Sequence, residues 1–136
     1  MMHIPSPRTG DQAIEQAIKQ AVKDAGADKY PRVTPADIEA NIVSEHYFTA
    51  EQGWAKAQED EDPIGDWLDV PEPLGLLTFC VLVLRNGFTV TGESACASPE
   101  NFDPEIGRRV ARANAVQKMW PLMGYALKDK LAKGEA

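Results

Sequence analysis

An unbroken apolar run at residues 76–84 and a stretch of alternating β-branched and polar residues at 88–96 stand out in the middle of the chain. Each stretch has the length of one strand, and Asn86-Gly87 lies between them. Asn-Gly is a strong hairpin signal because both residues tolerate the positive φ angles of a type I′ turn. The pattern predicts an antiparallel hairpin with strands 76–85 and 88–96.

A two-residue turn would also fix the strand register, with Val83 opposite Val90 and Phe79 opposite Ser94. The face predicted to be core then holds Leu77, Phe79, Val81, Val83, Phe88, Val90 and Cys96. The other face holds Thr78, Cys80, Leu82, Leu84, Thr89, Thr91 and Glu93. This second face is apolar on one strand and polar on its neighbour, so we expect a helix, another strand or a second copy of the chain to cover part of it.

Three helices are predicted before the hairpin. The first opens at Thr9 and runs to Ala25, and its apolar positions recur three and four residues apart, which predicts one buried face. The second opens at Thr34-Pro35, a cap followed by proline, and continues to about Val43. The third opens at Thr49, where Gln52 completes a capping box, and is short.

A longer helix follows the hairpin, with Asp103 as its cap. Its predicted core face is Ile106, Val110, Ala113, Val116 and Trp120. A separate stripe of small residues, Gly107, Ala111 and Ala115, allows another backbone to approach closely. Pro121 lacks an amide hydrogen and is expected to kink or break this helix.

These elements predict an α+β fold in which the hairpin packs against N-terminal helices and a long C-terminal helix kinked at Pro121. The 136 residues suit a single domain, 1–136. We expect residues 1–8 to form a flexible arm and residues 59–75 to form an acidic loop rich in proline and glycine.

The formal net charge of −7 comes from that loop, because seven acids and no base lie between Lys56 and Arg85. An acidic chain is a poor general ligand for phosphate backbones, so duplex nucleic acid is an improbable partner. No apolar run approaches the roughly 20 residues that span a bilayer, so no membrane association is expected.

The cysteines and histidines offer no metal chemistry. In the predicted register Cys80 and Cys96 lie on opposite faces and out of step, so we expect two free thiols in a reducing cytosol. His3 and His46 are the only histidines and there is no C-x-x-C motif, so neither a zinc site nor any cofactor is expected.

The C-terminal third carries most of the basic charge, and it supplies the candidate ligand site. Arg108, Arg112 and Asn114 can converge with the free amides of a helix start, an arrangement that attracts anions. The full candidate set is His46, Ser94, Asn101, Arg108, Arg112, Asn114 and Lys118. The same cationic face can instead pair with the acidic loop or contact a protein. His46 can be packed, bind a ligand or act in catalysis, and no catalytic residue is assigned.

Several stretches resemble a family of small tailed-phage and prophage proteins of unknown function. They are residues 77–95 (LTFCVLVLRNGFTVTGESA), residues 101–103 (NFD) with Ile106-Gly107, and the stretches beginning at Thr34-Pro35 and at Glu45-His46. The resemblance covers about Val33 to Leu131, and Gln58 to Val70 looks like an insertion relative to shorter members. It implies expression in a bacterial cytoplasm but no reaction or ligand.

Two classes of function follow. The favoured one is a non-enzymatic phage or prophage accessory protein, acting in host takeover or counter-defence. It would bind a host protein or a small anionic ligand and form a homo-oligomer. The alternative is a small metal- or histidine-dependent hydrolase or nuclease that uses His46 with Glu45, Glu93 or Asp103.

Overall fold

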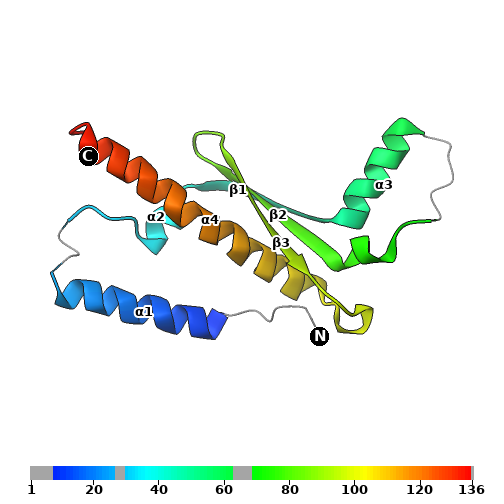
Figure 1. The fold of residues 1–136 in the computed structure, drawn as a ribbon, viewed down its shortest axis with the longest axis horizontal. Coiled ribbons are helices and arrows are strands. Elements are labelled where there is room, and N and C mark those ends of the chain that lie inside the picture. Colours follow the sequence, from blue (N-terminus) through cyan, green and yellow to red (C-terminus); the bar gives the residue numbers. More distant parts are fainter. Residues whose placement is uncertain (1–7, 27–29, 63–68, 136) are drawn as a thin grey trace.

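The computed structural model describes residues 8–26, 30–62 and 69–135. These residues form a three-stranded antiparallel sheet in the order β1-β2-β3 and four α-helices (Figure 1). The elements are α1 (Arg8–Asp24), α2 (Pro35–Ala40), β1 (Ile42–Thr49), α3 (Ala50–Glu61), β2 (Leu77–Leu84), β3 (Thr89–Ala95) and α4 (Pro104–Ala132). The predicted α+β class and the long C-terminal helix are confirmed.

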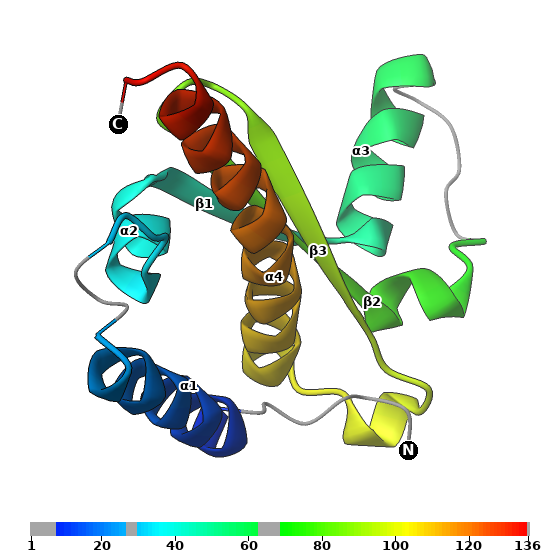
Figure 2. The same ribbon diagram turned by 60° about the vertical axis from the view of Figure 1, so that its left-hand side comes forward.

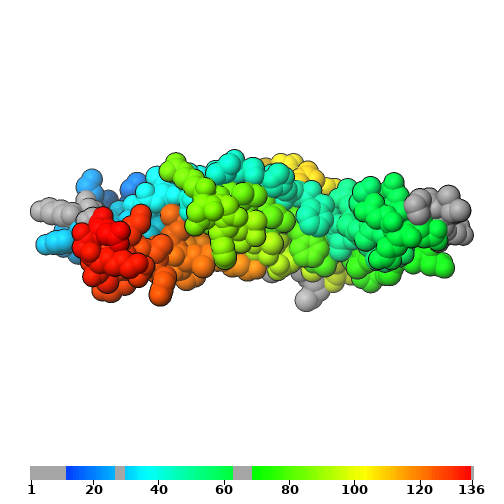
Figure 3. Space-filling model, turned by 90° about the horizontal axis from the view of Figure 1, so that it is seen from above, coloured from blue at the N-terminus to red at the C-terminus, as the bar shows by residue number. Residues whose placement is uncertain are grey.

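The body has two layers, with α4 lying along one face of the sheet (Figures 1 and 2). The helix α3 contacts β1 and β2 only where β1 leads into it, and it extends the molecule at one end. Figure 3 shows the resulting elongated, flat shape, with α1 and the end of α4 at the opposite end. Among the described helices, α4 alone packs along the sheet, and it leaves the other face open.

The hairpin turn has three residues, not two. The Gly87 amide donates to the Leu84 carbonyl at 2.9 Å and the Leu84 amide donates to the Phe88 carbonyl at 2.9 Å. Gly87 has a φ of 89°, whereas Asn86 has an ordinary negative φ. This geometry matches a type I turn followed by a left-handed residue. The predicted type I′ turn was therefore wrong, although the hairpin itself is correct.

One extra loop residue moves the register by one position, which turns the side chains of one strand to the opposite face. Leu82 pairs with Val90 and Cys80 with Gly92, rather than Val83 with Val90. The buried β2 residues are consequently Thr78, Cys80, Leu82 and Leu84. The prediction that Leu77, Phe79, Val81 and Val83 form the core face was wrong, and Phe88, also assigned to it, is exposed. Val90 and Cys96 are buried as predicted.

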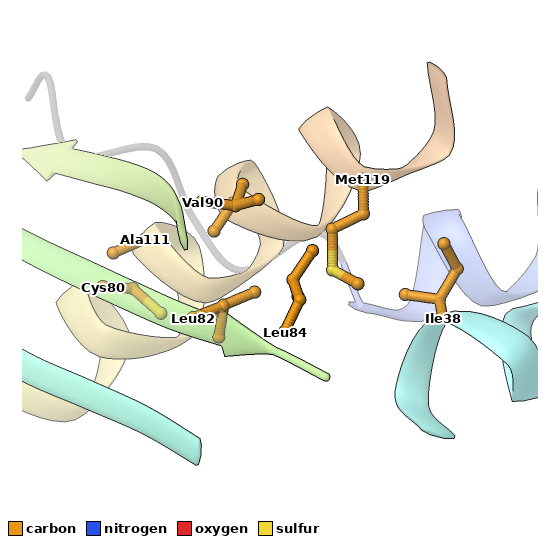
Figure 4. Packing of buried hydrophobic residues seen from close by; sticks show 8 residues of the cluster. Ile38, Cys80, Leu82, Leu84, Val90, Ala111 and Met119 are labelled. Carbon is orange, nitrogen blue, oxygen red and sulfur yellow. The ribbon is translucent and has the colours of Figure 1, made fainter. Parts of the chain in front are cut away.

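The core forms where this face of β2 meets α4 and α2. Leu84, Val90 and Met119 point toward one another, and Ile38 of α2 closes the cluster at one end (Figure 4). Cys80 and Cys96 are buried free thiols on this same face, not on opposite faces as expected. Cys96 lies beside Leu76 and Cys80 beside Gly92, so four residues of strand separate the thiols along the sheet.

The edge strand β1 was not predicted, because its residues were assigned to the end of a helix and the segment after it. The predicted helix from Thr34 does start there, with Thr34 and Asp37 forming a capping box, but it ends at Ala40. Residues Ile42–Thr49 form the strand, which pairs His46 with Val81 and Phe48 with Phe79. His46 is thus a strand residue, and its neighbours at positions 44 and 48 share its face.

The helix α3 begins as predicted, with Thr49 and Gln52 forming a reciprocal capping box, and it continues to Glu61. Part of the predicted acidic loop 59–75 is therefore helical, since Glu72–Leu76 also forms a short 3-10 helix. Residues 63–68 of that loop, and residues 1–7 of the predicted arm, lie outside the described residues.

The helix α4 starts at its predicted cap, Asp103, whose carboxylate accepts the Glu105 and Ile106 amides. It continues through Pro121 without a break. Its buried residues are Gly107, Val110, Ala111, Ala115 and Met119. The small residues Gly107, Ala111 and Ala115 are thus part of the core. Of the predicted core face only Val110 is buried, whereas Ile106, Ala113, Val116 and Trp120 are half-buried.

Gly92 explains this stripe. A Cβ built on Gly92 would overlap the Ala111 carbonyl oxygen and the Ala115 amide nitrogen, and it would lie 2.9 Å from the Ala115 Cα. The strand backbone therefore rests directly on the helix backbone, which is possible only because neither side carries a large side chain there.

The prediction that α1 buries one face was wrong. The helix occupies Arg8–Asp24, close to the predicted range. However, Ile14 is 60% exposed and Ile18 is 58% exposed. The apolar face of α1 therefore lies outside the core of the described residues.

Candidate functional site

The open face of the sheet is the first candidate surface. Phe79, Val81 and Val83 of β2 form a half-buried apolar row along its middle. Phe48 of β1 joins this row, with its ring centroid 5.6 Å from that of Phe79. Beyond the point where α3 contacts the strands, no described helix packs over the row. We refer to Phe48, Phe79, Val81 and Val83 as the open-face row.

Polar side chains flank this row on both neighbouring strands. On β1, the His46 Nε2 atom lies 3.0 Å from the Ser44 hydroxyl. On β3, Thr91 lies opposite Val81 and Glu93 lies opposite Phe79, and both are exposed. An apolar centre with a polar rim is the usual composition of a protein-binding patch.

The cationic side of α4 is the second candidate surface, and Arg112 is its central residue. Its guanidinium donates to both Glu39 carboxylate oxygens, at 2.8 and 3.2 Å, and to Glu45 at 3.1 Å. The side chain is 28% exposed. Hydrogen bonds to Glu39, and a further one to Glu45, raise the pKa of Arg112. Arg112 is therefore an internal tie between α4, α2 and β1.

Glu45 links this tie to an aromatic hydroxyl. Tyr47 donates a 2.7 Å hydrogen bond to Glu45. This bond, followed by the contact with Arg112, lowers the pKa of Glu45. Burial, and then the nearby Glu45 carboxylate, raise the pKa of Tyr47. The cluster thus holds a carboxylate ionised beneath the sheet edge, on the α4 side.

Asn114 and Lys118 lie along the edge of β3. The Asn114 amide donates to the Glu93 carbonyl at 2.7 Å. The Lys118 ammonium lies 3.8 Å from the Glu93 carboxylate. Both side chains therefore bind α4 to Glu93 at the edge of β3.

The remaining predicted site residues lie apart from these. Arg108 and Asn101 are exposed, on α4 and at the end of the 3-10 helix Pro99–Asn101. Ser94 is buried on the α4 side of β3, and His46 is on the open face. The start of α4, where an anion was expected to bind, is capped by Asp103. The structure thus brings Asn114 and Lys118 together at Glu93 and places Arg112 with two acids.

The residues named for the alternative hydrolase are also separated. Glu45 points to the α4 side and His46 to the open face. Glu93 is on the same face as His46, but β2 lies between their strands, which places the backbones roughly 10 Å apart. Within residues 8–26, 30–62 and 69–135, no three histidine, cysteine or acidic residues are grouped so that they could hold a metal ion.

The open-face row was not predicted from the sequence. The signal was present, because Phe79, Val81 and Val83 are apolar while the adjacent strand alternates with polar residues. The incorrect register assigned those three residues to the core.

Comparison with known proteins identifies a phage family. The model of the Phage protein (N4 Gp49/phage Sf6 gene 66) family matches residues 33–131. The searches of the curated proteins and of the solved structures find no match. No helix in the described part of the chain is long and apolar enough to cross a bilayer. The matched segment runs from the residue before the cap of α2 into the last turns of α4, so it includes the whole sheet and both candidate surfaces. The chain therefore belongs to the Phage protein (N4 Gp49/phage Sf6 gene 66) family.

Proposed function

We propose that this protein is a non-enzymatic phage or prophage accessory protein that binds a host protein through the open face of its sheet. The observation that carries the proposal is the open-face row, an apolar strip left without a covering helix. One-sided antiparallel sheets normally expose polar side chains on the solvated face. Host takeover or counter-defence is the role that such binding would serve.

The electrostatics favour a protein over a small anion. Arg112 already has two carboxylate partners, Lys118 has Glu93, and the start of α4 has Asp103. An added anion would have to displace these internal partners. Small-molecule sites are also concave, whereas the open face is one side of a sheet. A broad macromolecular surface suits this face better.

The area of the open sheet face limits how stable a complex formed through it alone can be. Strands of seven or eight residues extend about 25 Å, and three of them are about 14 Å wide. The footprint is on the order of 350 Å², below the roughly 800 Å² that each partner contributes to a standard stable interface. The partner must therefore also contact α3 or the β3 edge, or bind transiently.

The experiment is affinity capture from phage-infected bacteria with a matched pair of variants. Val81→Lys places a charge in the middle of the open-face row, while Ala126→Lys places the same charge on the exposed side of α4, which covers the other face of the sheet. We expect the wild type and Ala126→Lys to capture the same host protein and Val81→Lys to lose it, with both variants retaining wild-type circular dichroism. Equal capture by all three proteins would refute binding at this face.

A hydrolase is the second candidate, and one observation favours it. The 3.0 Å contact between Ser44 and the His46 Nε2 atom has the spacing of a nucleophile and its base. A fluorophosphonate probe would label Ser44 if the hydroxyl were activated, and the label would disappear in Ser44→Ala and His46→Ala. We expect no labelling of the wild type, because no acidic side chain among the described residues is hydrogen-bonded to this histidine.

A further inference from the structure

A groove of about 740 Å³ separates α1 from the rest of the molecule. Ile14 and Ile18 of α1 form one wall, and Val33, Pro35 and Trp120 line the opposite side. At about 30 Å³ per molecule, the space would hold roughly 25 waters. An apolar space of this size is far larger than a packing defect in a protein interior.

The helix α1 is itself amphipathic and leaves its apolar side chains in this groove. Ile14 and Ile18 are both more than half exposed although they repeat at helical spacing. Burying such a side chain is worth about 1.5–3 kcal/mol. The family match begins at residue 33 and so does not include α1. The exposed apolar surface therefore belongs to α1, a helix that precedes the segment matched by the family.

We propose that a second copy of this chain occupies the groove. In a twofold dimer the two α1 helices lie antiparallel, and Ile14 and Ile18 of each copy enter the groove of the other. A twofold interface requires a surface that is complementary to itself. The exposed stripe of α1 and the groove beside it meet this requirement, because each copy supplies both the inserted side chains and the space for them.

The charges at the groove support a second copy as the occupant. Glu15 and Lys19 both line the groove and lie one turn apart, beside Ile14 and Ile18. When two such helices run antiparallel with the twofold axis at Ala17, midway between Glu15 and Lys19, each Glu15 lies opposite the Lys19 of the other copy. Two reciprocal ion pairs then form at the rim of the interface. This interface is separate from the open-face row, so its test is independent of the proposed function.

The test is the mass in solution, measured by light scattering and sedimentation across a concentration series. We expect the wild type to have twice the 14.9 kDa of one chain. Ile14→Ser with Ile18→Ser should give a monomer with an unchanged circular dichroism spectrum, since neither residue belongs to the core cluster. The control Tyr125→Ser removes an exposed aromatic side chain from α4 and should leave the dimer intact.

The charge pairs provide a test of the antiparallel arrangement. Glu15→Lys alone and Lys19→Glu alone should each weaken the dimer about tenfold, because two exposed attractive contacts become repulsive. The double exchange Glu15→Lys with Lys19→Glu should restore the wild-type dissociation constant. A monomeric wild type, or a dimer that persists in Ile14→Ser with Ile18→Ser, would overturn the proposal. Failure of the double exchange to restore the dimer would overturn the antiparallel arrangement.

Discussion

The contact between Gly92 and α4 makes the substitution Gly92→Ala the sharpest test of the fold. A methyl group at this position would overlap the Ala111 carbonyl oxygen and the backbone of Ala115. Both obstacles are backbone atoms in the middle of a long helix, so no rotamer change can relieve the overlap. The helix would have to move away from β3, and the buried contacts of Ala111, Ala115 and Met119 would loosen with it.

The expected cost follows from overpacking. Added methylene groups in a well-packed core usually cost 1–3 kcal/mol, and sometimes more. We expect about 3 kcal/mol here, because the helix backbone cannot yield locally. Replacing glycine also restricts the unfolded chain, which offsets about 0.4–1 kcal/mol. The net loss of about 2–3 kcal/mol corresponds to a fall in melting temperature of about 10 °C for a chain of this size.

Urea unfolding followed by circular dichroism measures this loss, and Gly53→Ala is the matched control. A Cβ on Gly53 would lie 3.8 Å from the Phe48 ring, an ordinary contact, in the helix α3. The control should therefore gain about 0.5–1 kcal/mol from its higher helix propensity. The extrapolated free energy of unfolding carries an uncertainty of about 10–15%. A Gly92→Ala variant whose free energy of unfolding lies within about 0.5 kcal/mol of the wild-type value would refute direct backbone packing.

Three further predictions concern the turn, the charge cluster and a helix cap. Gly87→Ala should cost about 1–2 kcal/mol in urea unfolding, because its φ of 89° is unfavourable for a residue with a Cβ, and Gly87→Asn should cost less. Because the pKa of Glu45 is lowered below its ordinary 4.5 in the folded chain, its stabilising contribution is complete above pH 4.5 and is lost as the pH falls below that value. Tyr47→Phe should reduce this loss in thermal unfolding at a series of pH values, and an unchanged pH dependence would contradict the assignment. Thr49→Ala should cost about 1 kcal/mol by removing the capping box of α3, and a cost near zero would show that the cap is not stabilising.

Signals carried by neighbouring residues predicted local structure well. The caps Thr34, Thr49 and Asp103 each begin a helix where the sequence indicates. Capping depends on a side chain and amides two or three residues away, so the necessary information lies within one turn. Asn86-Gly87 likewise marks the hairpin correctly.

The register could not be read from the same residues. An Asn-Gly pair fits both a two-residue turn and the last two positions of a three-residue loop. The strand β2 is apolar at almost every position, so its own pattern does not distinguish the two faces. Gly92 faces α4 in either register, so the choice depends on which β2 side chains pack against that later helix, as Leu82 and Leu84 do. A contact of that kind leaves no periodic signal in either segment.

The candidate site was predicted less well for a related reason. Arg112 was predicted to bind an anion, to pair with the acidic loop or to contact a protein, but its partners are Glu39 and Glu45, which are 73 and 67 residues away in sequence. Their approach depends on β1, which was not predicted because Ile42 and Val43 also continue the apolar spacing of the preceding helix. Pairing with β2 decided the structure of this segment.

The central claim, that the open face binds a host protein, can be tested by site-specific photo-crosslinking in infected bacteria. A photoreactive phenylalanine analogue replaces Phe48, which is 39% exposed in the open-face row, or Tyr125 on α4 as a control. The proposed function predicts a covalent adduct between the analogue at position 48 and one host protein, absent from the control and abolished by adding Val81→Lys. No adduct from position 48, or an adduct with a second copy of this chain alone, would contradict it.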